Sequence, residues 1–145
     1  MSLKLIADSL GGSRLLGKGV ETPLGAINVI RHGLPAQSAF FLQNRLDVGD
    51  QEFSTTLGVS VKWLSRHRKE PKKHLDANVS DRLYRIARIV TLAEEVLETH
   101  ATAMHWLTRP QLGLGEMIPL ELLSTEIGAK EVEELLYRIE YGIYS

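Results

Sequence analysis

The chain has 145 residues, of which 43% are hydrophobic and 24% charged, a composition that is ordinary for a globular protein with one or two small domains. It contains no run of 18 or more apolar residues, no leader-like segment at its start and no cysteine, which argues against a membrane span, a secretory signal, a disulfide framework and a thiolate nucleophile. We therefore expect a cytoplasmic protein with no membrane association.

The net charge of −1 conceals two segments of opposite sign. Residues 58–74 carry six lysines and arginines against a single glutamate, Glu70. Residues 112–145 carry seven glutamates against only Lys130 and Arg138. This separation predicts two surfaces that face two different kinds of partner.

Residues 1–33 are predicted to form an N-terminal arm and a first helix. Glycines at positions 11, 12, 17 and 19 interrupt any helix in the first twenty residues, so we expect a mobile arm there. A phosphate-binding loop is disfavoured, because Gly17-Lys18-Gly19 lacks the hydroxyl residue that follows the lysine in such loops. Thr22 followed by Pro23 predicts the start of the first helix, and Gly33 predicts its end.

We expect residues 34–100 to form a helix-turn-helix domain. Its opening helix is predicted at residues 35–46, and the apolar residues available there for a core are Phe40, Phe41, Leu42 and Leu46. Asp47-Val48-Gly49 is predicted to end this helix.

Two short helices are predicted next, at residues 50–57 and 61–69. Ser54, Gly58 and Leu64 occupy the three characteristic positions of a helix-turn-helix. The motif needs a small residue where its helices cross, a turn residue that tolerates positive φ, and an apolar residue in the second helix.

The second of these helices, which Ser60 would cap, is the candidate recognition helix. Lys62, Arg66 and Lys69 fall at i, i+4 and i+7, so they share one face, and Ser65 lies beside them. Lysine and arginine in that position can neutralise phosphates or reach guanine edges in the major groove. The predicted DNA-binding residues are therefore Lys62, Ser65, Arg66 and Lys69. The alternatives are a solvated charged face and, for Trp63, either a contact with the DNA backbone or the favoured packing between helices.

A long helix is predicted to begin at a Ser80-Asp81 cap. Its apolar side is formed by Leu83, Ile86, Ala87, Val90, Ala93 and Leu97. Three arginines, at positions 82, 85 and 88, lie on its other faces. They either contact phosphates or, as we favour, pair with Glu94, Glu95 and Glu98.

Residues 101–145 are predicted to form a separate C-terminal module that begins near Thr99-His100. Its last helix has an apolar stripe formed by Val132, Leu135, Leu136 and Ile139. Gly142 suits the left-handed residue that follows a helix, which leaves residues 143–145 as a short tail.

No residue pattern in the chain predicts a catalytic, metal or cofactor site. The five histidines lack metal-ligand spacing, and no serine lies in a Gly-x-Ser-x-Gly sequence. We therefore expect a binding protein rather than an enzyme.

The C-terminal segment is similar to a known domain through the residues Trp106, Leu107, Pro110, Leu112, Gly113, Pro119, Leu120, Leu123, Thr125, Gly128, Val132, Leu136, Arg138, Ile139 and Gly142. In this order and spacing they resemble the toxin-binding domain of the Xre/MbcA/ParS-type antitoxins, the partners of RES-domain toxins. The helix-turn-helix also resembles the N-terminal domain of Xre-type antitoxins. The chain departs from the family where Leu114 separates Gly113 from Gly115.

This resemblance implies an all-α antitoxin of a type II toxin-antitoxin system. Such a protein would cover the active site of a RES-domain toxin that degrades NAD, and as a homodimer on operator DNA it would repress its own operon. The alternative is a stand-alone helix-turn-helix transcription factor whose C-terminal module binds a small ligand or dimerises.

The end of the chain supplies the candidate toxin-binding residues, which are Arg138, Glu140, Tyr141, Gly142, Ile143, Tyr144 and Ser145. A short end with an aromatic ring and a free carboxylate can enter a cleft in a partner. A frayed terminus is the alternative.

Overall fold

The computed structural model describes residues 2–142, which form nine α-helices, two short 3-10 turns and no β-strand. The elements are α1 (Leu3–Asp8), α2 (Gly12–Leu16), α3 (Pro23–His32), α4 (Ala36–Leu46), α5 (Asp50–Leu57), α6 (Val61–Arg68), α7 (Ala77–Val96), α8 (His100–Leu107), η1 (Leu112–Leu114), η2 (Pro119–Leu122) and α9 (Glu126–Glu140). The predicted all-α fold is confirmed.

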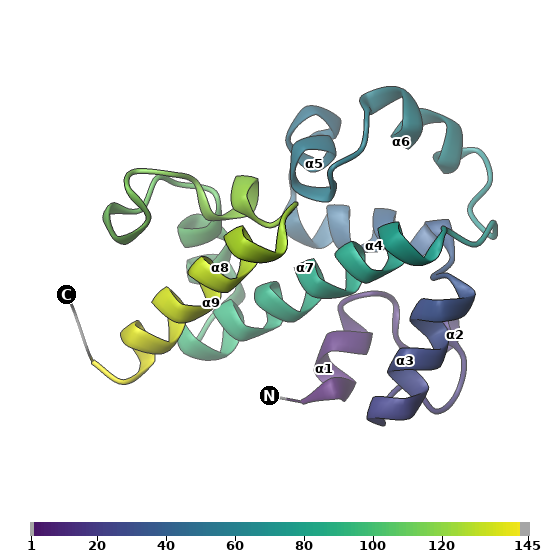
Figure 1. Ribbon diagram of the computed structural model, residues 1–145, viewed down its shortest axis with the longest axis horizontal. Helices are drawn as coiled ribbons and strands as arrows, with labels where there is room; N and C mark the ends of the chain where they lie inside the picture. Colours follow the sequence, from purple (N-terminus) through teal and green to yellow (C-terminus); the bar gives the residue numbers. More distant parts are fainter. Residues whose placement is uncertain (1, 143–145) are drawn as a thin grey trace.

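The 20-residue helix α7 crosses the middle of the molecule, and the other elements are arranged around it (Figure 1). It contacts α1 and α3 from the N-terminal segment, α5 from the helix-turn-helix, and α8 and α9 from the C-terminal segment. Half of its residues are buried. A helix that is enclosed in this way needs apolar residues over most of its circumference, as Leu83, Ile86 and Ile89 provide.

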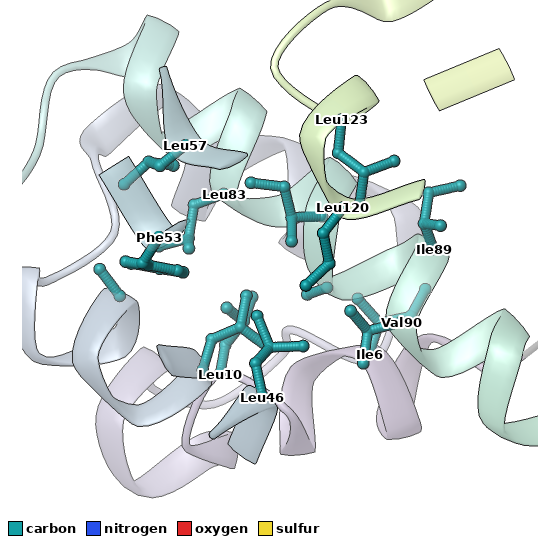
Figure 2. Packing of buried hydrophobic residues seen from close by; sticks show 14 of the residues in the cluster. Ile6, Leu10, Leu46, Phe53, Leu57, Leu83, Ile89, Val90, Leu120 and Leu123 are labelled. Carbon is teal, nitrogen blue, oxygen red and sulfur yellow. The ribbon is translucent and has the colours of Figure 1, made fainter. Parts of the chain in front are cut away.

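A single hydrophobic core joins the segments that pack on α7. Figure 2 shows Phe53 of α5 and Leu83 of α7 in the same cluster as Ile6 from α1 and Leu120 from η2. Each fully buried side chain of this size contributes roughly 1.5–3 kcal/mol before ordering costs. The helix-turn-helix and the C-terminal segment are therefore fixed to each other through shared apolar packing.

The expectation of a mobile N-terminal arm is wrong for the described residues 2–20. The chain forms α1 and α2 there, and Ile6 and Leu10 are almost completely buried in the core. Gly11 and Gly17, both with positive φ, lie at the start and the end of α2. The glycines thus divide the segment into short helices, and packing of α1 on α7 and of α2 on α1 and α4 then stabilises them.

The predicted start of the long helix is also wrong. Helix α7 begins four residues before the expected position of its first turn, and Asp76 caps it by accepting a hydrogen bond from the Val79 N–H at 2.8 Å. Ser80 is fully buried inside the helix, and its hydroxyl accepts a hydrogen bond from the Leu34 N–H at 2.8 Å. Ser80 was predicted to cap the helix because serine is a common cap residue. Its hydroxyl instead binds a backbone N–H that is distant in the sequence.

Helix α4 follows the predicted bounds, but its apolar residues do not all reach the core. Leu42 and Leu46 are buried, whereas Phe41 is 40% exposed and Phe40 packs only partly against the core. Phe41 is adjacent to Leu42 in sequence, so it projects about 100° around the helix from it and faces outward.

Candidate functional site

Helices α5 and α6 form the predicted helix-turn-helix. Helix α5 ends at Gly58, whose φ of 75° is the left-handed conformation that glycine adopts without strain. Helix α6 then begins at Ser60, whose hydroxyl accepts a hydrogen bond from the Trp63 N–H at 2.9 Å. Phe53 and Leu64 are completely buried on the inner sides of the two helices. The local signals in the sequence therefore predicted this motif and its turn correctly.

The outer face of α6 carries the four predicted DNA-binding residues. Lys62, Ser65, Arg66 and Lys69 are all exposed. Within residues 2–142, the side chains of these four residues make no hydrogen bond or ion pair. The cations on this face are therefore available to a negatively charged partner.

Trp63 and His67 occupy the flank of α6. Their rings are stacked, with centroids 3.7 Å apart, and the His67 Nδ1 lies 2.8 Å from the Trp63 carbonyl oxygen. Trp63 packs partly against the hydrophobic core. This geometry agrees with the favoured expectation that Trp63 packs between helices.

Arg68 ends α6 but does not belong to the exposed cationic face. Its guanidinium donates to both carboxylate oxygens of Asp50, at 2.7 and 3.2 Å, and to the Gln43 side chain at 3.3 Å. It also lies 4.6 Å above the ring of Phe40. The hydrogen bonds from Arg68 and Gln43 lower the pKa of Asp50 below its usual value. Of the six lysines and arginines in residues 58–74, Arg68 therefore connects α6 to α4 and α5 and is not part of the exposed cationic face.

Helix α9 presents a second surface. Val132 and Leu136 on its inner face are completely buried, and α9 packs along α7. Its outer face carries Ile127, Tyr137 and Tyr141, which are 79%, 36% and 70% exposed. The two tyrosine rings are stacked with centroids 6.3 Å apart. We call these three residues the α9 outer stripe.

The structure describes four of the seven predicted toxin-binding residues. Arg138 is half-buried, whereas Glu140, Tyr141 and Gly142 are exposed. Gly142 has a φ of 69°, which confirms the expected left-handed residue after the helix. Ile143, Tyr144 and Ser145 lie outside the described residues.

The sequence interpretation missed Ile127 and Tyr137 as parts of this surface. The signal for them is the spacing, because Ile127 precedes Tyr141 by fourteen positions, or two heptads, and Tyr137 precedes it by four. Both separations place residues on one face of a helix.

The arginines of α7 connect the two surfaces. The Arg82 Nε donates to the Leu57 carbonyl oxygen at the end of α5, at 3.0 Å. Arg85 donates to Glu126, at 3.2 Å, and Arg88 forms an ion pair with Glu133 of α9. Helix α7 thus contacts the helix-turn-helix through Arg82, and it contacts α9 through Arg85 and Arg88.

The predicted pairing of these arginines with Glu94, Glu95 and Glu98 is therefore wrong. Glu94 instead binds Arg45 of α4, with an N–O distance of 2.7 Å. The reason is spacing along the helix, because Arg88 is six residues from Glu94 and ion pairs within a helix require three or four. Helix α9 lies beside the arginines and supplies closer carboxylates.

Residues 2–142 contain neither a metal-binding cluster nor a helix that could cross a membrane. That range holds no group of three or more histidine, aspartate or glutamate side chains suited to a metal ion. None of its helices combines the length and the hydropathy that a bilayer-crossing helix needs.

A helix-turn-helix with free cations and a second helical unit packed on the same long helix define the class of fold, an all-α chain with a helix-turn-helix domain followed by a small C-terminal domain. Residues 25–88 match the antitoxin Xre-like helix-turn-helix domain, and residues 92–142 match the antitoxin Xre/MbcA/ParS C-terminal toxin-binding domain. The chain belongs to the Xre antitoxin family.

Curated relatives agree with this assignment. The antitoxin Xre of Photorhabdus laumondii is 32% identical over 118 residues, which cover 81% of this chain and 79% of that protein. The antitoxin Xre of Pseudomonas putida is 35% identical over 77 residues, covering 53% of this chain and 48% of that protein. The antitoxin Xre of Yersinia enterocolitica is 32% identical over 95 residues, covering 65% of this chain and 64% of that protein.

The contrast between Arg66 and Arg68 gives a test of the α6 geometry. We expect Arg68→Ala to lower the free energy of unfolding by about 1 kcal/mol, because it removes a forked ion pair and the contact with Phe40. The matched variant Arg66→Ala should change it by less than about 0.5 kcal/mol, since an exposed, unpaired side chain is lost. Urea denaturation of both variants measures the difference, and equal effects would contradict the assignment of Arg68 to the fold.

Proposed function

We propose that this protein is the antitoxin of a type II toxin-antitoxin system that neutralises a RES-domain, NAD-degrading toxin and represses its own operon. The proposal rests on membership of the Xre antitoxin family together with one structural observation. Helix α6, which carries the free cations, and helix α9, which carries the outer stripe, lie in different parts of the molecule (Figure 1). One chain can therefore hold DNA and a toxin without a conflict between the two sites.

On the DNA side, α6 acts as the recognition helix. Lys62, Arg66 and Lys69 contact phosphates or guanine edges, and Ser65 adds a neutral hydrogen-bonding group on the same face. A single recognition helix reads too few base pairs for useful specificity. The protein therefore binds its operator as a homodimer, with one α6 in each of two half-sites.

On the toxin side, the α9 outer stripe is the docking surface. Exposed aromatic residues such as Tyr137 and Tyr141 supply large contact areas at a low entropic cost, which makes them typical binding anchors. The surrounding glutamates favour a basic surface on the toxin. Arg138, Glu140 and Gly142 continue from this stripe into Ile143, Tyr144 and Ser145, the segment that covers the toxin's active site.

The DNA-binding half is tested with the double variant Lys62→Ala/Arg66→Ala on the DNA upstream of the protein's own gene. We expect loss of specific binding, because two of the free cations are removed, while inhibition of the toxin is retained. The wild-type affinity should fall by about 10³–10⁵ between about 50 and 200 mM salt if the dimer makes six to ten phosphate contacts. Fluorescence anisotropy across the salt series measures both effects.

The matched control is Arg14→Ala/Lys18→Ala, which removes the same charge from exposed positions on the N-terminal segment. It should leave operator affinity nearly unchanged. An equal loss of affinity in the control would show that net charge rather than α6 determines binding. Full DNA binding without toxin inhibition would instead identify a stand-alone transcription factor.

The toxin-binding half is tested by deleting residues 143–145. Folding should be intact, because the core of the described residues ends at Leu136. We expect the toxin to remain associated through α9 while its NAD-degrading activity returns. Co-purification and an NAD consumption assay separate these two effects, and complete inhibition by the truncated protein would disprove the role of the tail.

A further inference from the structure

Val61 is an apolar residue on the face of α6 that carries polar and charged side chains. It is the first residue of the helix and is 40% exposed. Ser65 follows it by one turn and shares its face, which lies beside the stripe of Lys62, Arg66 and Lys69, and all of these residues are exposed. The buried face of the helix lies elsewhere, at Leu64.

The fold offers no reason for a valine at this position. The start of α6 is already fixed by the Ser60 cap, and apolar contacts on both sides of the cap come from Val59 and Leu64, which belong to the core region. Valine is also a weaker helix former than many polar residues that would suit an exposed site. Isolated apolar residues are common on surfaces, so the position of Val61 has to supply the argument.

That position is the one from which a recognition helix reads bases. The N-terminal residues of such a helix contact base edges, while the rest of the motif contacts the backbone. In the major groove, the C5-methyl group of thymine is the apolar feature of the base edges, and it is recognised by apolar side chains. Valine at the first position of α6 therefore matches thymine by its chemistry.

We propose that Val61 determines operator specificity by contacting the 5-methyl group of one thymine in each half-site. This inference rests on the proposed function, because it requires α6 to enter the major groove. Within that arrangement, Lys62, Arg66 and Lys69 supply affinity through charge, and Val61 supplies a sequence preference that charge alone cannot provide.

The experiment uses the full chain and a pool of random DNA duplexes, from which the preferred sequence is selected. Each thymine of that sequence is then replaced by deoxyuridine, which pairs identically and lacks only the methyl group. We expect the affinity to fall about four-fold at one thymine per half-site, the effect of losing one buried methyl group. The other thymines should show little change.

Two variants assign the effect to Val61. Val61→Ser removes the apolar contact and should bind the thymine and deoxyuridine duplexes equally. Val61→Thr keeps one methyl group and nearly the same shape, so it should retain the preference for thymine. Both variants must unfold at the wild-type temperature, which excludes a folding defect because the side chain lies outside the core.

The outcomes separate the two proposals. A selected sequence without a methyl-dependent thymine, or a methyl dependence that persists in Val61→Ser, would overturn the role of Val61 and leave DNA binding by α6 intact. Failure to select any sequence would overturn sequence-specific DNA binding itself, and the role of Val61 with it.

Discussion

The burial of α7 among elements from every part of the chain is the constraint on which the structure depends. This helix contacts the N-terminal helices, the helix-turn-helix and the C-terminal domain. At its centre, Arg82 reaches the end of α5 while Arg85 binds the segment that leads into α9. A Cβ placed on Gly58 would lie 3.5 Å from both the Arg82 Nε and the Ser124 Cβ, so the turn of the helix-turn-helix lies close to the residues that lead into α9. The two domains therefore share one hydrophobic core and contact each other directly.

The distribution of arginine and lysine follows from this arrangement. The guanidinium groups of Arg68 and Arg85 each reach several acceptors, Arg82 reaches the Leu57 carbonyl oxygen, and all three connect separate elements. Arginine suits that purpose because its planar group makes two or more directed hydrogen bonds. The side chains of Lys62 and Lys69 remain solvated on α6. These arginines thus stabilise the fold, while Lys62, Arg66 and Lys69 leave their positive charge exposed along one helix.

The sequence predicted those features that local chemistry determines. The turn at Gly58 and the cap at Ser60 depend on residues within one or two turns, and both were predicted correctly. The failures involve distant partners. Ser80 was assigned as a cap although its hydroxyl is used by Leu34, 46 residues away, and the N-terminal segment is ordered by burial against a helix some seventy residues later. Ile127 and Tyr137 of the α9 outer stripe were likewise missed, although the sequence analysis included their neighbour Tyr141.

The central claim is that one shared core carries two independent binding surfaces, and a ternary complex tests it most directly. The antitoxin would be mixed with a catalytically inactive form of its toxin and with operator DNA, and the mixture examined by sedimentation velocity with separate labels on toxin and DNA. We predict one species that carries both labels, because α6 and the α9 outer stripe do not overlap. Mutually exclusive binding, in which the toxin releases DNA or DNA releases the toxin, would contradict the account.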